Sequence, residues 1–301
     1  MNMHRLVLLR RAAGFTAAGA MSLYLLVKLV WIALELFHGT SDWVLLNAVT
    51  VVMALVGGAL GLALAQSWGT RSPTWLVLPA CWIAGGFLVS MLPFMVASGV
   101  LAPSAPEPAD DASMPAWETV LIGVGFAAMA VALVVGLPLF LRERWPHAFT
   151  GRVGRDRADA RTAWILLPLT ALGALWVYWA AGGTAGLDPA AEALWDVNAR
   201  LLVANSALWA VAGAWSMWTL GRWGSGRGRV WLPMALGFVA SGSLFSWGGW
   251  KLLWLLLPGM YQPVEHRWVA VTEHGVAIVT GAAVLLVLTR VYRRRACDPI
   301  Y

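Results

Sequence analysis

Long apolar stretches alternate with short polar connections along almost the whole chain. A helix that crosses a bilayer needs roughly 20 predominantly apolar residues. Eight stretches meet this requirement, at approximately 12–36, 43–66, 75–98, 117–141, 162–182, 197–220, 230–257 and 268–292. The pattern therefore predicts an all-α polytopic membrane protein with eight transmembrane helices, in which residues 1–301 form a single integral-membrane domain.

The composition agrees with lipid as the main solvent of the chain. Hydrophobic residues make up 60% of the sequence and charged residues only 12%, whereas an average soluble domain carries about 25% charged residues. This balance excludes a soluble enzyme, a secreted disulfide scaffold and a disordered chain. The first apolar stretch is too long for the core of a signal peptide, so we expect it to be retained as the first helix.

The basic residues are concentrated in every second connection between the predicted helices. Lys28 and Lys251 are the only lysines among the 21 basic residues, and the other 19 are arginines. All the arginines except Arg200 and Arg267 fall at the N-terminus, in every second connection or in the C-terminal tail. Because positively charged segments stay cytoplasmic, this alternation predicts that both termini are cytoplasmic. Because the arginines are distributed by membrane side and do not form one basic patch, they also argue against a nucleic-acid-binding surface.

An internal repeat is suggested by two connections that resemble each other. The segments from Trp68 to Trp75 and from Trp223 to Trp231 both begin with Trp-Gly, and both end in a tryptophan that opens the next apolar stretch. We therefore expect two parallel four-helix halves, 12–141 and 162–292. Coincidence is the alternative, because the chain contains 20 tryptophans.

The two lysines lie inside apolar stretches, in the similar sequences Lys28-Leu-Val-Trp31 and Lys251-Leu-Leu-Trp254. Helix geometry places each ammonium roughly 10 Å below the outer interface, where a cation costs about 2.5–3.5 kcal/mol. One interpretation is a binding site for an anionic group. The other is structural: the lysine stem reaches towards the interface, with the tryptophan three residues later covering it or contacting the cation.

Other polar residues gather in the same outer half of the predicted bundle. Glu273 and His274 enter the last helix from outside, close to the level of Lys251, where they could exchange protons. The sequence thus predicts an outward-facing ligand-binding site, with candidate residues Lys28, Lys251, Trp31, Trp254, Glu273, His274, Asn47 and Arg200.

No metal or cofactor is assigned from the sequence. Glu265-His266 and Glu273-His274 repeat a Glu-His pair, but eight residues turn an ideal helix by about 80°, so the pairs are not expected to share a face. Cys81 and Cys297 are expected neither to form a disulfide nor to build a metal site. The sequence has no phosphate-binding loop, zinc-binding His-Glu-x-x-His helix or Gly-x-Ser-x-Gly elbow.

These observations favour a membrane carrier for a small molecule or ion, with efflux or self-protection as its use. Two alternatives stay open: a membrane-embedded enzyme acting on a lipid-soluble substrate, and an accessory or scaffold subunit of a membrane complex. The expected partners are the lipid bilayer, a small ligand and, in the last case, a membrane subunit. The arginine-rich, lysine-poor composition resembles that of membrane proteins from high-GC bacteria, so we expect the bacterial inner membrane.

Overall fold

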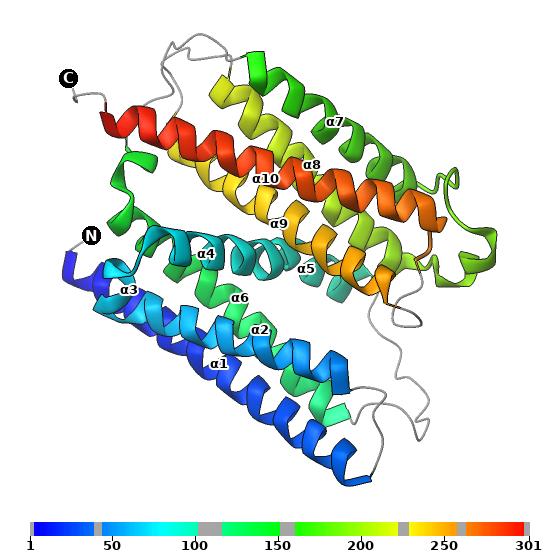
Figure 1. Cartoon of the computed structure of the whole chain (residues 1–301), viewed down its shortest axis with the longest axis horizontal. Coiled ribbons are helices and arrows are strands. Elements are labelled where there is room, and N and C mark those ends of the chain that lie inside the picture. Colours follow the sequence, from blue (N-terminus) through cyan, green and yellow to red (C-terminus); the bar gives the residue numbers. More distant parts are fainter. Residues whose placement is uncertain are drawn as a thin grey trace. The chain divides into compact units, whose positions relative to one another are not determined.

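The computed structural model describes residues 3–38, 44–101, 116–150, 160–221, 229–257 and 263–297, which form helices and no strand (Figure 1). The acidic, proline-containing connection 102–115 lies outside the described residues. The α-helices are α1 (Met3–His38), α2 (Val44–Ala65), α3 (Ser67–Arg71), α4 (Thr74–Leu88), α5 (Leu92–Leu101), α6 (Ala116–Arg144), α7 (Ala160–Ala180), α8 (Val197–Gly221), α9 (Trp231–Leu256) and α10 (Arg267–Cys297). Short 3-10 segments cover Val89–Met91, Pro146–Ala148 and Pro189–Leu194.

Six helical segments of the described chain are long and apolar enough to cross a membrane. They are Arg5–Phe37, Asn47–Ala65, Thr74–Leu101, Val120–Arg144, Val197–Gly221 and Arg267–Arg294. At most 39% of any of these spans is buried inside the protein, so each leaves a broad apolar surface for lipid. The chain is therefore a polytopic helical membrane protein.

The other two predicted spans also form helices, but they differ from these six. The stretch 162–182 corresponds to α7, whose apolar part, Trp164–Ala180, is shorter than the others. The stretch 230–257 corresponds to α9, which is 26 residues long but is not among the six candidate spans, and which contains several serine and glycine residues. Its small residues serve packing: a Cβ atom on Gly237 would lie 2.4 Å from the Ser216 Oγ of α8.

The predicted span 75–98 is interrupted at Val89–Met91. Pro93 has no amide hydrogen to donate to the carbonyl of Val89, and that carbonyl instead accepts a tighter hydrogen bond from the backbone of Leu92. The Ser90 hydroxyl donates back to the carbonyl of Gly86. Two α-helices joined by a 3-10 turn thus replace the single continuous helix.

The chain divides into two compact units, and the dividing point within α4 lies between Ala84 and Gly85. The first unit comprises residues 1–84 and 106–144. In it, α1 packs against both α2 and α6. The α1–α2 contact depends on glycine: a Cβ atom on Gly61 would lie 2.6 Å from the backbone nitrogen of Ala18, and one on Gly14 would lie 2.5 Å from that of Ala65. Glycines at such crossings allow close approach of helix backbones.

Two arginines fix one end of this first unit. Arg10 lies 4% exposed, donates to the carbonyl of Leu64 and pairs with Glu143 at 3.2 Å. Arg144 donates to the carbonyls of Gly69 at 2.9 Å and of Thr70, at the end of α3. These guanidinium groups satisfy carbonyls that a helix leaves without intrahelical partners.

The second unit comprises residues 85–105 and 145–301 and contains the up-and-down bundle of α7, α8, α9 and α10. Consecutive helices run antiparallel (Figure 1), and α10 packs back against α7, which closes the ring. The core between them includes Leu169, Trp176, Met217 and Val284. The segment with α5 packs against α8, where Trp209 donates its indole N–H to the carbonyl of Ser90 at 2.8 Å.

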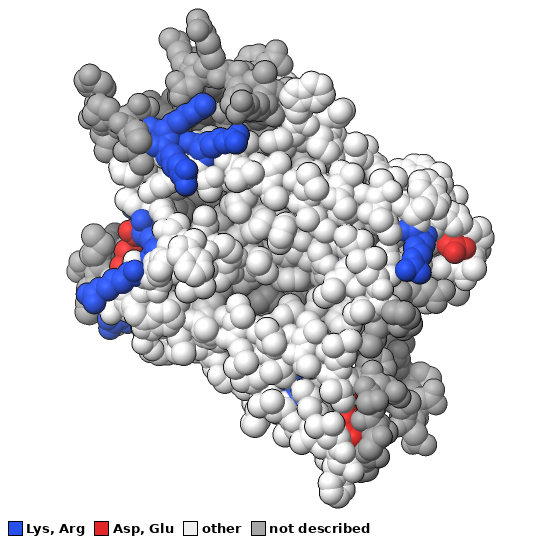
Figure 2. All heavy atoms as spheres, viewed as in Figure 1, with Lys and Arg blue, Asp and Glu red and all other residues white. Residues whose placement is uncertain are grey.

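The two ends of this bundle differ in charge. Arg290, Arg293 and Arg294 lie near the end of α10, and Figure 2 shows basic side chains gathered there. The opposite end holds the C-terminal ends of α7 and α9 and the N-terminal ends of α8 and α10. That second end contains the cluster described next.

Candidate functional site

Two loops meet at the end of the four-helix bundle of the second unit, where they form a short antiparallel bridge between Leu187 and Glu265. The backbone N–H of Asp188 donates to the carbonyl of Val264 at 2.9 Å, and that of His266 donates to Gly186 at 3.0 Å. Gly186 adopts a φ of 88°, a conformation that glycine accepts without steric cost. The bridge holds Glu265 immediately before α10.

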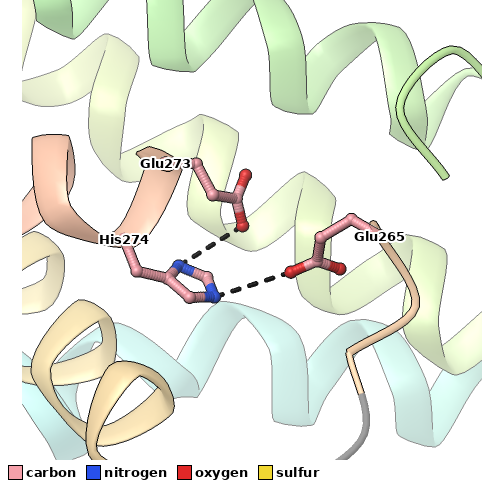
Figure 3. Close-up of side chains that lie close together, drawn as sticks. All are labelled: Glu265, Glu273 and His274. Atoms are coloured by element: carbon pink, nitrogen blue, oxygen red, sulfur yellow. Dashed lines mark ion pairs between the residues drawn. The ribbon is translucent and has the colours of Figure 1, made fainter. Parts of the chain in front are cut away.

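Three ionisable side chains meet beneath this bridge (Figure 3). The Nδ1 atom of His274 lies 3.3 Å from Oε1 of Glu273, and its Nε2 atom lies 3.5 Å from Oε1 of Glu265. The exposed fractions of His274, Glu273 and Glu265 are 3%, 5% and 7%. The imidazole therefore lies between two buried carboxylates, one from its own helix and one from the loop before it.

Trp176 of α7 fixes the second oxygen of Glu273. Its indole N–H donates to Oε2 at 3.0 Å, in a buried hydrogen bond between residues far apart in the sequence. A carboxylate held in this way cannot rotate freely about its terminal bond. The cluster is thereby joined to α7 as well as to α10.

The cluster opens onto a cavity that has about 50 Å³ of space for the centres of water-sized molecules, room for about three or four of them. Its lining combines the three ionisable residues with Lys251 and with aromatic side chains, among them Trp176, Trp179, Trp195 and Trp247. The buried indole nitrogen of Trp195 makes no hydrogen bond in the described part of the chain. The cavity is therefore apolar over much of its wall and strongly polar at one side.

Lys251 contributes a positive charge to this cavity, but forms no direct ion pair with a described carboxylate. Burial by itself would raise the pKa of Glu265. The interaction with His274 and the charge of Lys251 outweigh burial, so this pKa lies below the ordinary value for glutamate. Glu265 is thus held in its anionic form at neutral pH.

The donor atoms of the cluster have the chemistry of a metal centre. Glu265, Glu273 and His274 each offer one ligand atom, and these atoms lie within 4.8 Å of one another. Neither Nε2 of His274 nor Oε1 of Glu265 makes a hydrogen bond in the described structure. The arrangement can hold a cation, or it can pass a proton between the carboxylates and the imidazole.

Among the residues predicted from the sequence, Lys251, Glu273 and His274 come together at this cavity. Trp254 is buried beside Trp250, with ring centroids 5.1 Å apart, and does not line the cavity. Arg200 is exposed, also outside the lining.

The other predicted residues, Lys28, Trp31 and Asn47, belong to the first unit. Asn47 donates to Glu35 at 3.3 Å. The Nζ atom of Lys28 lies 5.7 Å from the centre of the Tyr24 ring. Its aromatic partner is thus one helical turn before Lys28, whereas the expected partner Trp31 lies three residues after it. Helical side chains lean towards the N-terminus, which favours this partner over Trp31.

Sequence reasoning missed Glu265 as a partner of His274. The rotation of about 80° over eight residues holds only if both residues lie on one helix, but α10 begins at Arg267. Glu265 precedes the helix, and the loop bridge turns it back towards His274. The repeated Glu-His pair was the available signal, and the expectation that it would not converge was wrong for Glu265.

Comparison with known proteins gives no further guide to this site. No model of a protein family matches the chain, and no significant match is found among curated proteins or solved structures.

Proposed function

We propose that the protein is a membrane carrier for a small ion or small polar molecule, with its binding site at the cavity of the second unit. One observation supports this most strongly: Glu265, Glu273 and His274 are buried in mutual contact on that cavity, with Lys251 in its wall. Ionisable groups inside a membrane protein are costly, and where they occur they typically mark substrate or ion pathways.

The size of the cavity favours a carrier over an enzyme for lipid-soluble substrates. Space for about three or four water molecules suits an ion or a small hydrated solute. A lipid-sized substrate needs a pocket of about 300 Å³ or more. In this proposal Lys251 balances part of the carboxylate charge and is not the main ligand.

The orientation in this proposal follows the arginine pattern. Arg290, Arg293 and Arg294 lie at the end of α10 away from the cluster, so cytoplasmic arginines put the cavity in the extracytoplasmic half. The proposal includes eight crossings, cytoplasmic termini, two parallel halves and the bacterial inner membrane as its location. Fusing a reporter that is active only in the cytoplasm after each connection tests this arrangement.

The proposed transport is tested with purified full-length protein in liposomes. The vesicles are given a mixture of small inorganic ions, and the accumulated ions are quantified by elemental mass spectrometry. We expect one class of ion to accumulate with the wild-type protein and to fall to the level of empty vesicles with Glu273→Gln. The matched control is Glu35→Gln, which changes a glutamate of the first unit.

Two outcomes contradict the proposal. One is that no ion accumulates above empty vesicles although the protein is folded and inserted. The other is accumulation that is unchanged in Glu273→Gln, which would remove the cluster from the transport path. A Lys251→Ala variant tests the role of the lysine separately: unchanged transport at equal expression would show that its charge is dispensable.

A further inference from the structure

We propose that Glu265, Glu273 and His274 form a binding site for a divalent transition-metal ion of the zinc class, and that this ion is the cargo of the carrier. The identification as cargo rests on the proposed function, whereas the metal site itself does not. The ligands would come from α10 and from the loop before it (Figure 3). The indole of Trp176 on α7 would hold Glu273 in place.

Hydrogen-bond donors and acceptors do not balance within the cluster. Two carboxylates offer only acceptor atoms, and a neutral imidazole offers one N–H and one lone pair. The indole of Trp176 supplies one donor to Glu273, but Nε2 of His274 and Oε1 of Glu265 face each other at 3.5 Å without a hydrogen bond. With two carboxylates and a single imidazole N–H, the cluster has more acceptors than donors, and a cation bound among them would satisfy the carboxylate oxygens that remain without a partner.

The ligand atoms of the cluster are also of the type that zinc binds. One imidazole nitrogen with two carboxylate oxygens is a donor set that zinc accepts, at metal–ligand distances of about 2.0–2.2 Å. Tetrahedral ligands at that radius are about 3.3–3.6 Å apart. One imidazole nitrogen and one oxygen of each carboxylate lie within 4.8 Å of one another, so small side-chain movements would bring them to this spacing around a single ion. Hard cations such as Mg²⁺ prefer ligand sets made only of oxygen atoms.

The cluster is also accessible to an ion. All three residues line the same cavity, and the cavity has space for water molecules to complete the coordination. An ion bound by three protein ligands and water keeps an open position, through which it can be exchanged. Such a site suits a transported ion better than a fully enclosed structural site would.

Replacing Lys251 tests the proposal, because the metal site predicts that Zn²⁺ affinity increases when this lining residue is changed. Its ammonium lines the cavity and repels any cation that binds there. Replacing it by methionine keeps the stem and removes the charge. We therefore expect Lys251→Met to bind Zn²⁺ about tenfold more tightly or better. If Lys251 were instead the ligand of an anionic cargo, its removal would abolish binding of that anion and would not strengthen the binding of Zn²⁺.

The experiment measures Zn²⁺ binding to purified full-length protein in detergent, by competition with a chromophoric chelator. We expect one Zn²⁺ per chain in the wild type, and affinity at least about 100-fold weaker in Glu265→Gln, Glu273→Gln and His274→Gln. The control is His266→Gln, which changes the neighbouring histidine whose side chain does not line the cavity. Co²⁺ as a second probe reports tetrahedral coordination through its visible absorption.

The outcomes separate the metal site from the carrier. Wild-type protein that binds no Zn²⁺, or binds it equally in all variants, overturns the metal site, and this conclusion does not depend on whether a variant folds. Transport of another ion without Zn²⁺ binding would overturn the metal site and leave the carrier standing. Stoichiometric Zn²⁺ binding without Zn²⁺ uptake into liposomes would keep the site and overturn the ion as cargo.

Discussion

Replacing His274 by leucine is expected to destabilise the protein by about 3–5 kcal/mol, because it leaves two carboxylates buried without their shared partner. Glu273 and Glu265 are 5% and 7% exposed, and each has one oxygen within 3.5 Å of the imidazole. The measurement is the free energy of unfolding in mixed detergent micelles, followed by circular dichroism.

A variant that removes the whole cluster tests whether unpaired carboxylates cause this loss of stability. Changing Glu265 and Glu273 to methionine together with His274→Leu replaces three interacting polar groups by apolar ones of similar size. Such replacements are often close to neutral, because the desolvation cost disappears with the charges. We expect the triple variant to be more stable than His274→Leu alone. A triple variant that is as unstable as the sum of its parts would show that the three side chains do not compensate one another.

Replacing Gly61 by leucine is expected to separate α1 from α2 and to lower stability by about 3 kcal/mol or more. A Cβ atom at this position would lie 2.6 Å from the nitrogen of Ala18 and 2.9 Å from the carbonyl oxygen of Gly14. Both are backbone atoms of α1, so only a shift of a whole helix can relieve the overlap. The measurement is the same unfolding free energy, together with the yield of monodisperse protein.

Gly19→Leu is the matched control for this change. Gly19 also lies in α1, but a Cβ atom there meets nothing within 4 Å. The two substitutions are the same in chemistry and differ only in what surrounds them. Equal stability of the two variants would show that α1 and α2 do not cross at the small residues.

The sequence predicts the helices well because their signal is local. An apolar stretch of about 20 residues such as 43–66 has one stable solution in lipid, since its backbone groups must be paired within the stretch. α9 shows the limit of this signal. It is long enough to cross a bilayer but is not among the six candidate spans, and its Gly237 packs closely against Ser216 of α8.

The site was predictable only in part, because its geometry depends on where a helix begins. The depth of Glu273 and His274 relative to Lys251 follows from counting residues along antiparallel helices, and these residues do share the cavity. Glu265 depends on a loop bridge to Leu187, far away in the sequence. No periodicity reports such a contact. Lys28 shows the converse: a motif shared with Lys251 does not imply a shared environment.

The bridge between the two loops makes the amide hydrogens of Asp188 and His266 reporters of site opening. Each is held by a backbone bond to the opposite loop, at 2.9 and 3.0 Å, and each exchanges with solvent when that pairing breaks. Glu265 lies within the paired segment, so its carboxylate cannot leave His274 by a loop movement that preserves both bonds. Deuterium uptake at these positions, with and without Zn²⁺, therefore measures how often the loop pairing that holds the backbone of Glu265 opens.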